Sequence, residues 1–199
     1  MAYITKQEAL DAANARVRRK FSATAKSVLK EEVQKQNFDK TTTYDVFLSH
    51  SSEDAQIVLG IYQILLSQGL KVYVDWIEDA QLNRANVSAE TADLLRERMK
   101  ASTSMLVITT KNSTESKWIP WELGYFDGHN RGLVGILPVL DRADSTFKGQ
   151  EYFGLYPVVT RLPVVNQNRT ELFVVENAQR GYRELATFAK GATAIRAFS

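Results

Sequence analysis

The sequence has no cysteine among its 199 residues and only two histidines, His50 and His129. Without cysteine the chain forms no disulfide and offers no thiolate to a metal or a substrate, and two histidines need carboxylates beside them to bind a metal. No apolar run approaches the ~18 residues that cross a membrane, and the N-terminal segment lacks the apolar stretch of a secretion signal. We therefore expect no metal, no membrane partner and a cytoplasmic location.

Strong net charge and glycine-rich phosphate loops are also missing. The 25 lysines and arginines nearly balance 23 aspartates and glutamates, and the formal charge of +2 is well below that of a basic nucleic-acid binder. Neither G-x-G-x-x-G nor G-x-x-x-x-G-K-[ST] occurs in the chain. The sequence therefore predicts an ordinary globular protein that binds no nucleic acid.

Residues 1–41 form a segment without glycine or proline, which we interpret as a helical arm. Thr5 and Glu8 have the spacing of a capping box at its start. Apolar residues then recur every three or four positions, at Leu10, Ala13, Val17, Phe21, Ala25 and Val28. The arm either packs as a helix on the rest of the protein, which we favour, or serves oligomerisation or a partner.

Short apolar runs alternate with helical patterns after residue 41. Strands are predicted at residues 44–49, 70–75, 104–110, 133–140 and 158–165, and helices at 53–67, 88–100, 119–128 and 170–190. The strands lack strict alternation of apolar and polar residues, which indicates burial on both faces. The pattern predicts a doubly wound, five-stranded parallel α/β sheet in a domain of residues 42–165, with residues 166–199 as a C-terminal helical extension packed on it.

Ligands of such sheets bind beyond the carboxyl ends of the strands, where the winding direction switches. The candidate substrate-binding residues at this edge are Ser49 and His50 after the first strand, Asp75 and Trp76 after the second, and Thr110 after the third. Asp54 also lies near this edge, and its position at a helix start fits an N-cap equally well.

The stretch SKWIPWELGY at residues 116–125 places a carboxylate next to this edge. Pro120 is best tolerated in a first helical turn, so the helix begins near Trp118 and Glu122 lies within about a turn of its N-terminus. Trp118 and Glu122 are four residues apart and share one helix face. A core tryptophan beside a helix-terminal charge is the simpler interpretation, and a catalytic carboxylate beside an aromatic ring is the alternative.

One carboxylate is enough to break the bond between nicotinamide and ribose. The nicotinamide ring is cationic before cleavage and leaves as a neutral molecule, so no general acid is needed. The carboxylate would stabilise the oxocarbenium-like transition state, and an indole ring could stack on the cationic leaving group.

Three motifs together resemble a TIR (Toll/interleukin-1 receptor) domain of the prokaryotic type: YDVFLSHSSED at residues 44–54, GLKVYVD at 69–75 and W-x-x-x-E at 118–122. The resemblance covers about residues 42–165. It implies a flavodoxin-like five-stranded parallel sheet and cleavage of NAD, bound as a substrate and not as a cofactor, by Glu122 with Trp118 beside it. It also implies self-association through the 76–87 loop.

A TIR domain with so few attached segments resembles the signal-making TIR subunit of antiphage systems such as Thoeris. That resemblance implies an ADP-ribose product, hydrolysed, cyclic or otherwise modified, that acts on a separate effector. Two alternatives remain open at this point: a non-catalytic TIR interaction module, and a nucleoside deoxyribosyltransferase-like enzyme, which also breaks N-glycosidic bonds with a carboxylate.

Overall fold

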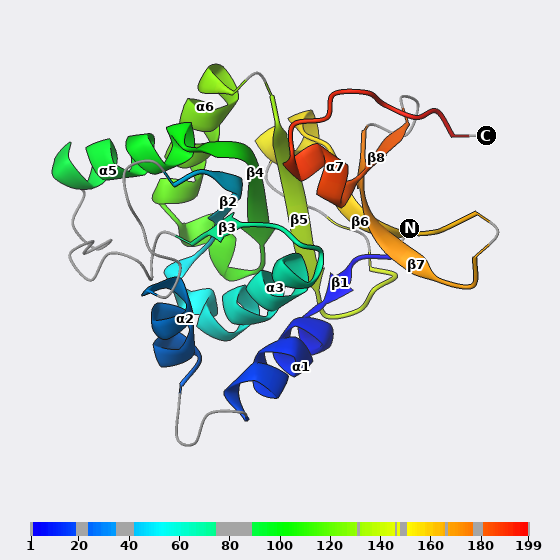
Figure 1. Ribbon diagram of the computed structural model, residues 1–199, viewed down its shortest axis with the longest axis horizontal. Helices are drawn as coiled ribbons and strands as arrows, with labels where there is room; N and C mark the ends of the chain where they lie inside the picture. The colour runs from blue at the N-terminus through cyan, green and yellow to red at the C-terminus, as the bar shows by residue number, and fades with distance from the viewer. Residues whose placement is uncertain are drawn as a thin grey trace.

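The computed structural model describes residues 2–18, 24–34, 42–74, 89–130, 132–145, 147, 151–165, 167–176 and 181–198. These residues form one mixed β-sheet with helices on both faces (Figure 1). The predicted loop 76–87, together with Asp75 and Trp76, lies outside the described residues.

Five parallel strands make up the centre of the sheet, as the sequence predicts. Their spatial order is β3 (Val72–Tyr73), β2 (Tyr44–Ser49), β4 (Ser102–Thr109), β5 (Val134–Leu140) and β6 (Val158–Pro163). The first strand of the five is flanked by the second and the third, which is the flavodoxin-like order. The winding direction therefore switches between β2 and β4, and a ligand crevice is expected at their carboxyl ends.

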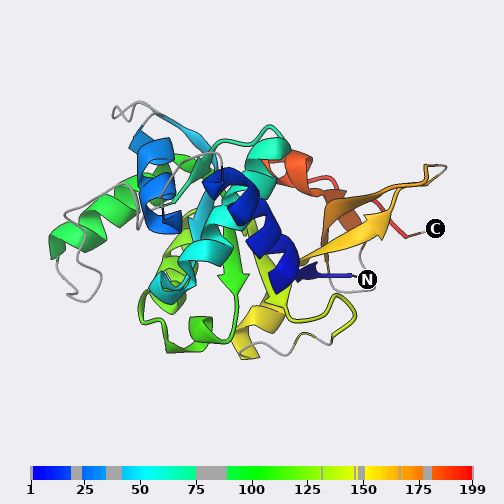
Figure 2. The same cartoon turned by 90° about the horizontal axis from the view of Figure 1, so that it is seen from below.

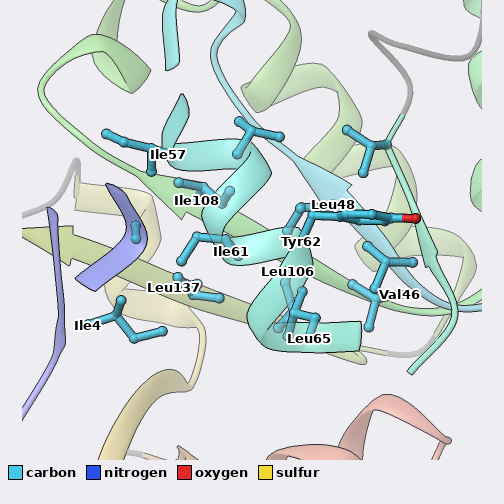
Figure 3. Close-up of a cluster of buried hydrophobic side chains, with 14 of the residues drawn as sticks. Ile4, Val46, Leu48, Ile57, Ile61, Tyr62, Leu65, Leu106, Ile108 and Leu137 are labelled. Carbon is cyan, nitrogen blue, oxygen red and sulfur yellow. The ribbon is translucent and has the colours of Figure 1, made fainter. Parts of the chain in front are cut away.

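Helices cover the two faces of the sheet with separate apolar clusters. On one face, α3 (Ala55–Ser67) places Ile57, Ile61 and Leu65 over strand residues such as Leu48 and Leu106 (Figure 3). Its short lead-in η1 (Ser52–Asp54) follows β2, and Gly69, at φ 73°, follows its C-terminus. On the other face, α5 (Ala89–Lys100) and α6 (Trp118–His129) cover a second, aromatic-rich cluster.

The N-terminal arm packs against the domain, which confirms the favoured interpretation. It forms α1 (Lys6–Val17), which begins with the predicted capping box of Thr5 and Glu8, and α2 (Ala25–Gln34). The α1 helix lies directly on α3 (Figure 2), so closely that a side chain at Gly60 would overlap the carbonyl oxygen of Ala9. Glycine at this position is therefore what permits the close approach of the two helix backbones.

A short strand, β1 (Ile4–Thr5), precedes α1 and pairs in parallel with Val139 and Leu140 of β5. The carbonyl oxygen of Ala2 accepts a hydrogen bond from the backbone N–H of Arg161 at 2.7 Å, and the Arg161 side chain forms an ion pair with Glu8. The N-terminal segment is thus joined to both β5 and β6.

The predicted helix at residues 170–190 is wrong. Residues Thr170–Val175 form β7, antiparallel to β6, and Tyr182–Glu184 form β8, antiparallel to β7. Among the described residues of this segment, only Leu185–Ala189 are helical, as α7. The run TELFVV is rich in residues that favour strands, and the free edge of β6 offers it a backbone partner. Gly181, at φ 115°, also excludes a continuous helix. The C-terminal extension therefore adds two antiparallel strands to the five parallel ones, and with β1 on β5 the sheet of the described residues has eight strands.

Candidate active site

Glu122 lies in α6, where the sequence placed the helix start correctly. The helix begins at Trp118, and Pro120 falls in its first turn, where a missing N–H costs no intrahelical hydrogen bond. Glu122 is the fifth residue and faces the sheet, with 0% of its surface exposed. A carboxylate so deeply buried requires hydrogen-bond partners.

Ser49, the last residue of β2, supplies one of these partners. Its hydroxyl donates to Oε2 of Glu122 at 2.6 Å, and Ser49 is itself fully buried. The bond joins the end of β2 to the second turn of α6, although 73 residues separate the two in sequence. The structure thus brings together two of the residues that the sequence singled out.

Trp118 lies in the aromatic-rich cluster with 6% of its surface exposed. Its ring meets Trp121 edge to face at 5.5 Å, whereas Trp121 stacks outward along α6 on Tyr125 at 5.9 Å. The guanidinium of Arg96 lies 5.3 Å from the Trp121 ring. The Trp118 and Glu122 pair is therefore the buried pair of this helix, and the second aromatic pair faces α5.

His50 is fully buried, and its Nδ1 donates to the carbonyl oxygen of Leu48 at 2.8 Å. Because a carbonyl oxygen only accepts, this bond fixes the proton on Nδ1. The contact gives His50 a structural role in the turn after β2, and its contact with substrate stays a prediction.

Asp54 occupies the N-cap position of α3, as the N-cap interpretation expected, but its side chain makes no capping hydrogen bond. Its carboxylate instead accepts hydrogen bonds from the Thr110 hydroxyl at 2.6 Å and from Nδ2 of Asn112 at 2.7 Å. The hydroxyl of Ser51 accepts the backbone N–H of Glu53 at the start of η1. Asp54 therefore ties the loop after β2 to the loop after β4 across the switch point, and Thr110 is engaged in that bond.

A cavity of about 580 Å³ opens at the carboxyl ends of β4 and β5. Its walls come from the polar run 109–114, the end of β5, the start of α3, and the side chains of Lys6, Phe147 and Phe153. Thr110 is the one predicted substrate-binding residue among the described residues that lines it; Ser49, His50, Trp118 and Glu122 do not. The cavity and the Ser49–Glu122 pair are therefore separate features of the same sheet edge.

Within the described ranges no helix is long and apolar enough to cross a membrane. The same residues contain no group of three or more histidine, aspartate or glutamate side chains arranged to hold a metal ion. Asp75 and Trp76, the remaining predicted substrate-binding residues, lie outside the part of the chain that the structure describes.

A family model described as TIR domain matches residues 46–160, more than half of the chain. The chain belongs to the TIR domain family. This confirms the resemblance drawn from the YDVFLSHSSED and W-x-x-x-E motifs, and it fits the flavodoxin-like strand order described above.

Two bacterial TIR relatives carry names that describe an activity. The chain is 46% identical over 159 residues to the probable 3′ cyclic ADP-D-ribose synthase ThsB′ of Bacillus cereus (strain MSX-D12), which covers 79% of this chain and 80% of that protein. It is also 33% identical over 98 residues to TIR2 of Cytobacillus dafuensis, which is named as a cyclic ADP-D-ribose synthase too. This second match covers 49% of this chain and 26% of that protein.

Among solved structures, the TIR domain of the Toll-related receptor TRR-2 from Hydra magnipapillata is similar with a TM-score of 0.40 and 20% sequence identity. The match covers 55% of this chain and 78% of that chain.

Proposed function

We propose that this TIR protein cleaves the nicotinamide–ribose bond of NAD and converts the remainder into a cyclic ADP-ribose. The observation that carries the proposal is the 46% identity to a protein named as a 3′ cyclic ADP-D-ribose synthase, over about four fifths of both chains. The buried Glu122 carboxylate supports it, because one carboxylate is enough for this chemistry, and Trp118, one turn before it in α6, offers an aromatic ring.

In the proposed reaction the bond between C1 of the ribose and the nicotinamide nitrogen breaks, and its electron pair leaves with neutral nicotinamide. Glu122 stabilises the positive charge that develops on the ribose. A nucleophile within the ADP-ribose then bonds to C1 and loses its proton, which closes the ring. Capture by water instead would give linear ADP-ribose. The reaction as written requires no cofactor and no metal.

Ser49 acts in this scheme as a positioning residue. Its 2.6 Å hydrogen bond holds one oxygen of Glu122 and fixes the orientation of the carboxylate before substrate arrives. Trp118, His50, Asp75 and Trp76 are proposed substrate contacts around this carboxylate. Thr110 instead donates its hydroxyl to Asp54, which joins the two loops, and it lines the neighbouring cavity.

Glu122 has no exposed surface in this conformation, so NAD reaches it only after the groups that cover it move apart. A low basal activity follows from this burial, and we propose that assembly of the protein raises it. We further propose that self-association uses residues 76–87 and that the cyclic product activates a separate effector in the cytoplasm during antiphage defence. The two relatives named as cyclic ADP-D-ribose synthases support the cyclic product on which this wider role rests.

The proposal is tested by incubating the protein with NAD at high protein concentration and analysing the products by mass spectrometry. We expect nicotinamide and a cyclic ADP-ribose from the wild type and neither from Glu122→Gln, which keeps the shape of the side chain and removes its charge. Glu115→Gln is the matched control, because Glu115 is an exposed glutamate at the end of the short 3-10 helix (Asn112–Glu115) before α6.

Each outcome of this assay separates the proposal from its alternatives. Turnover of deoxynucleosides instead of NAD would identify a deoxyribosyltransferase, and the absence of turnover in any oligomeric state would favour the interaction module. Equal turnover by wild type and Glu122→Gln would show that a residue other than Glu122 is catalytic.

A further inference from the structure

We propose that the cavity at the ends of β4 and β5 is a ribonucleotide-binding site distinct from the Glu122 site. At about 580 Å³ it lies within the range of small-molecule sites, roughly 300–1,000 Å³. It opens at the carboxyl edge of the sheet, beside the switch point, where folds of this type bind ligands. The binding itself does not depend on whether Glu122 acts on NAD, because neither Glu122 nor Ser49 lines the cavity.

The lining offers a partner for each part of a ribonucleotide. Lys6 and Lys111 supply cations for phosphate, the aromatic ring of Phe147 supplies a face for a base, and Asp141 supplies a carboxylate for ribose hydroxyls. Lys111 pairs with Asp141 at 3.3 Å, but the two side chains are 90% and 68% exposed. An exposed pair of this kind contributes little, so a bound phosphate can draw Lys111 away from Asp141.

Thr109 carries an independent indication of a ligand. It lines the cavity with 4% of its surface exposed, and its hydroxyl has no hydrogen-bond partner among the described residues. A buried hydroxyl without a partner destabilises a protein and therefore calls for an explanation. A polar ligand group in the cavity would satisfy it.

The walls of the cavity are held in place before any ligand binds. Asp54 fixes the loop after β4 through Thr110 and Asn112, and the Ser113 hydroxyl donates to the Thr110 carbonyl at 2.7 Å. On the opposite side, the pairing of β1 with β5 fixes the start of α1 and with it Lys6. A preorganised site loses less entropy on binding, and this one also includes a side chain from the N-terminal arm.

Isothermal titration calorimetry on the full-length Glu122→Gln protein tests the proposal without turnover, with ADP, adenosine and inorganic phosphate as the three probes. We expect ADP to bind. Lys6→Ala should weaken the binding of ADP and of phosphate about tenfold, as expected for the loss of one charge-assisted hydrogen bond, and should leave the binding of adenosine unchanged. Phe147→Ala should weaken the binding of ADP and adenosine and leave the binding of phosphate unchanged.

Two further variants separate binding from folding. Thr109→Val keeps the shape of the side chain, so it should leave the unliganded protein folded, and no less stable, while weakening ADP. Lys30→Ala removes an exposed lysine of α2 that is remote from the cavity lining and should change nothing. Hydrogen exchange should slow on ADP addition in peptides that contain residues 2–10 and 109–114.

The proposal would be overturned if ADP did not bind, or if Lys30→Ala lowered the ADP affinity as much as Lys6→Ala. It would also be overturned if ADP slowed exchange only in peptides that contain Ser49 and Glu122. A loss of ADP affinity in Ser49→Ala as large as in Lys6→Ala would also overturn it, because the cavity would then be part of the Glu122 site. NAD cleavage is measured separately on the wild type, so failure of either proposal is recognised without reference to the other.

Discussion

Ser49 offers a test of how Glu122 is positioned. Its hydroxyl makes a 2.6 Å bond to the buried carboxylate, and hydrogen bonds to charged groups contribute about 1.5–3 kcal/mol. We predict that Ser49→Ala lowers kcat for NAD cleavage by about tenfold to a hundredfold, with a smaller change in KM. Mass-spectrometric turnover assays at several NAD concentrations measure both constants.

Ser104→Ala is the matched control for this substitution. Ser104 is another fully buried serine with one hydrogen bond, from its hydroxyl to the carbonyl oxygen of Asp45 at 2.8 Å, but it does not contact Glu122. It should lower thermal stability and leave kcat nearly unchanged. Equal losses of kcat in the two variants would contradict a positioning role for Ser49.

The raised pKa of Tyr156 leads us to predict that the protein loses stability at high pH. Burial raises the pKa of its phenol to about 12, and the nearby Asp127, whose Oδ2 accepts the phenol proton at 3.1 Å, adds to the rise. Between about pH 10 and 12 the unfolded chain loses this proton and the folded protein keeps it, so the free energy of unfolding falls as pH rises. The contribution is complete below pH 10.

The measurement is urea unfolding from pH 9 to 11.5, for wild type and Tyr156→Phe. The variant should be less stable at pH 9, by about 1 kcal/mol for the lost hydrogen bond, and its stability should fall less steeply above pH 10. A parallel decline of the two proteins would show that Tyr156 titrates normally.

Individual site residues were predictable from sequence only where an element fixes their place. Ser49 ends an apolar strand and Glu122 follows a proline in the first turn of a helix, so the sequence placed both near the sheet edge. The bonds from Thr110 and Asn112 to Asp54 were missed, because they join two irregular loops and no periodicity reports which loop side chains meet.

Gly60 is the position where two helices depend on a missing side chain. We predict that Gly60→Ala destabilises the protein by about 1–3 kcal/mol, because the added methyl group forces α1 away from α3. Gly128→Ala is the control in α6, where an added methyl group meets nothing within 4 Å and should stabilise the helix by about 0.5–1 kcal/mol. Thermal unfolding of both variants measures the difference, and a stabilised Gly60→Ala protein would contradict the close helix contact.

At the level of elements, the sequence predicted the α-helices and strands that the structure describes in residues 44–165, because continuous apolar runs and helix stop signals mark them, but not the short 3-10 helices at Asn112–Glu115 and Glu151–Leu155. The prediction failed at residues 170–190, where two strands and a short helix were taken for one helix. Both strands depend on a neighbour, β6 or β7, and that pairing is a tertiary effect that a local pattern does not contain.

The N-terminal arm is part of the folded core of the whole molecule. Removal of residues 2–34 would expose the face of α3 that packs on Ala9 and Ala13 and would strip Ile4 from β5. We predict that the truncated protein loses most of its thermal stability and binds a hydrophobic dye, measured by calorimetry and dye fluorescence. A truncated protein that melts like the full chain and differs only in its mass by light scattering would instead support an oligomerisation arm.

The pairing of β1 with β5 also bears on the order in which the chain folds during synthesis. Residue 4 pairs with residue 139, and the carbonyl of Ala2 accepts a hydrogen bond from the N–H of Arg161. The first strand therefore cannot reach its place until most of the chain has left the ribosome. Contacts of such high sequence separation slow folding. Residues 2–5 are therefore made before the strands that they join and are among the last to reach their place, and until then the position beside the end of β5 stays unfilled.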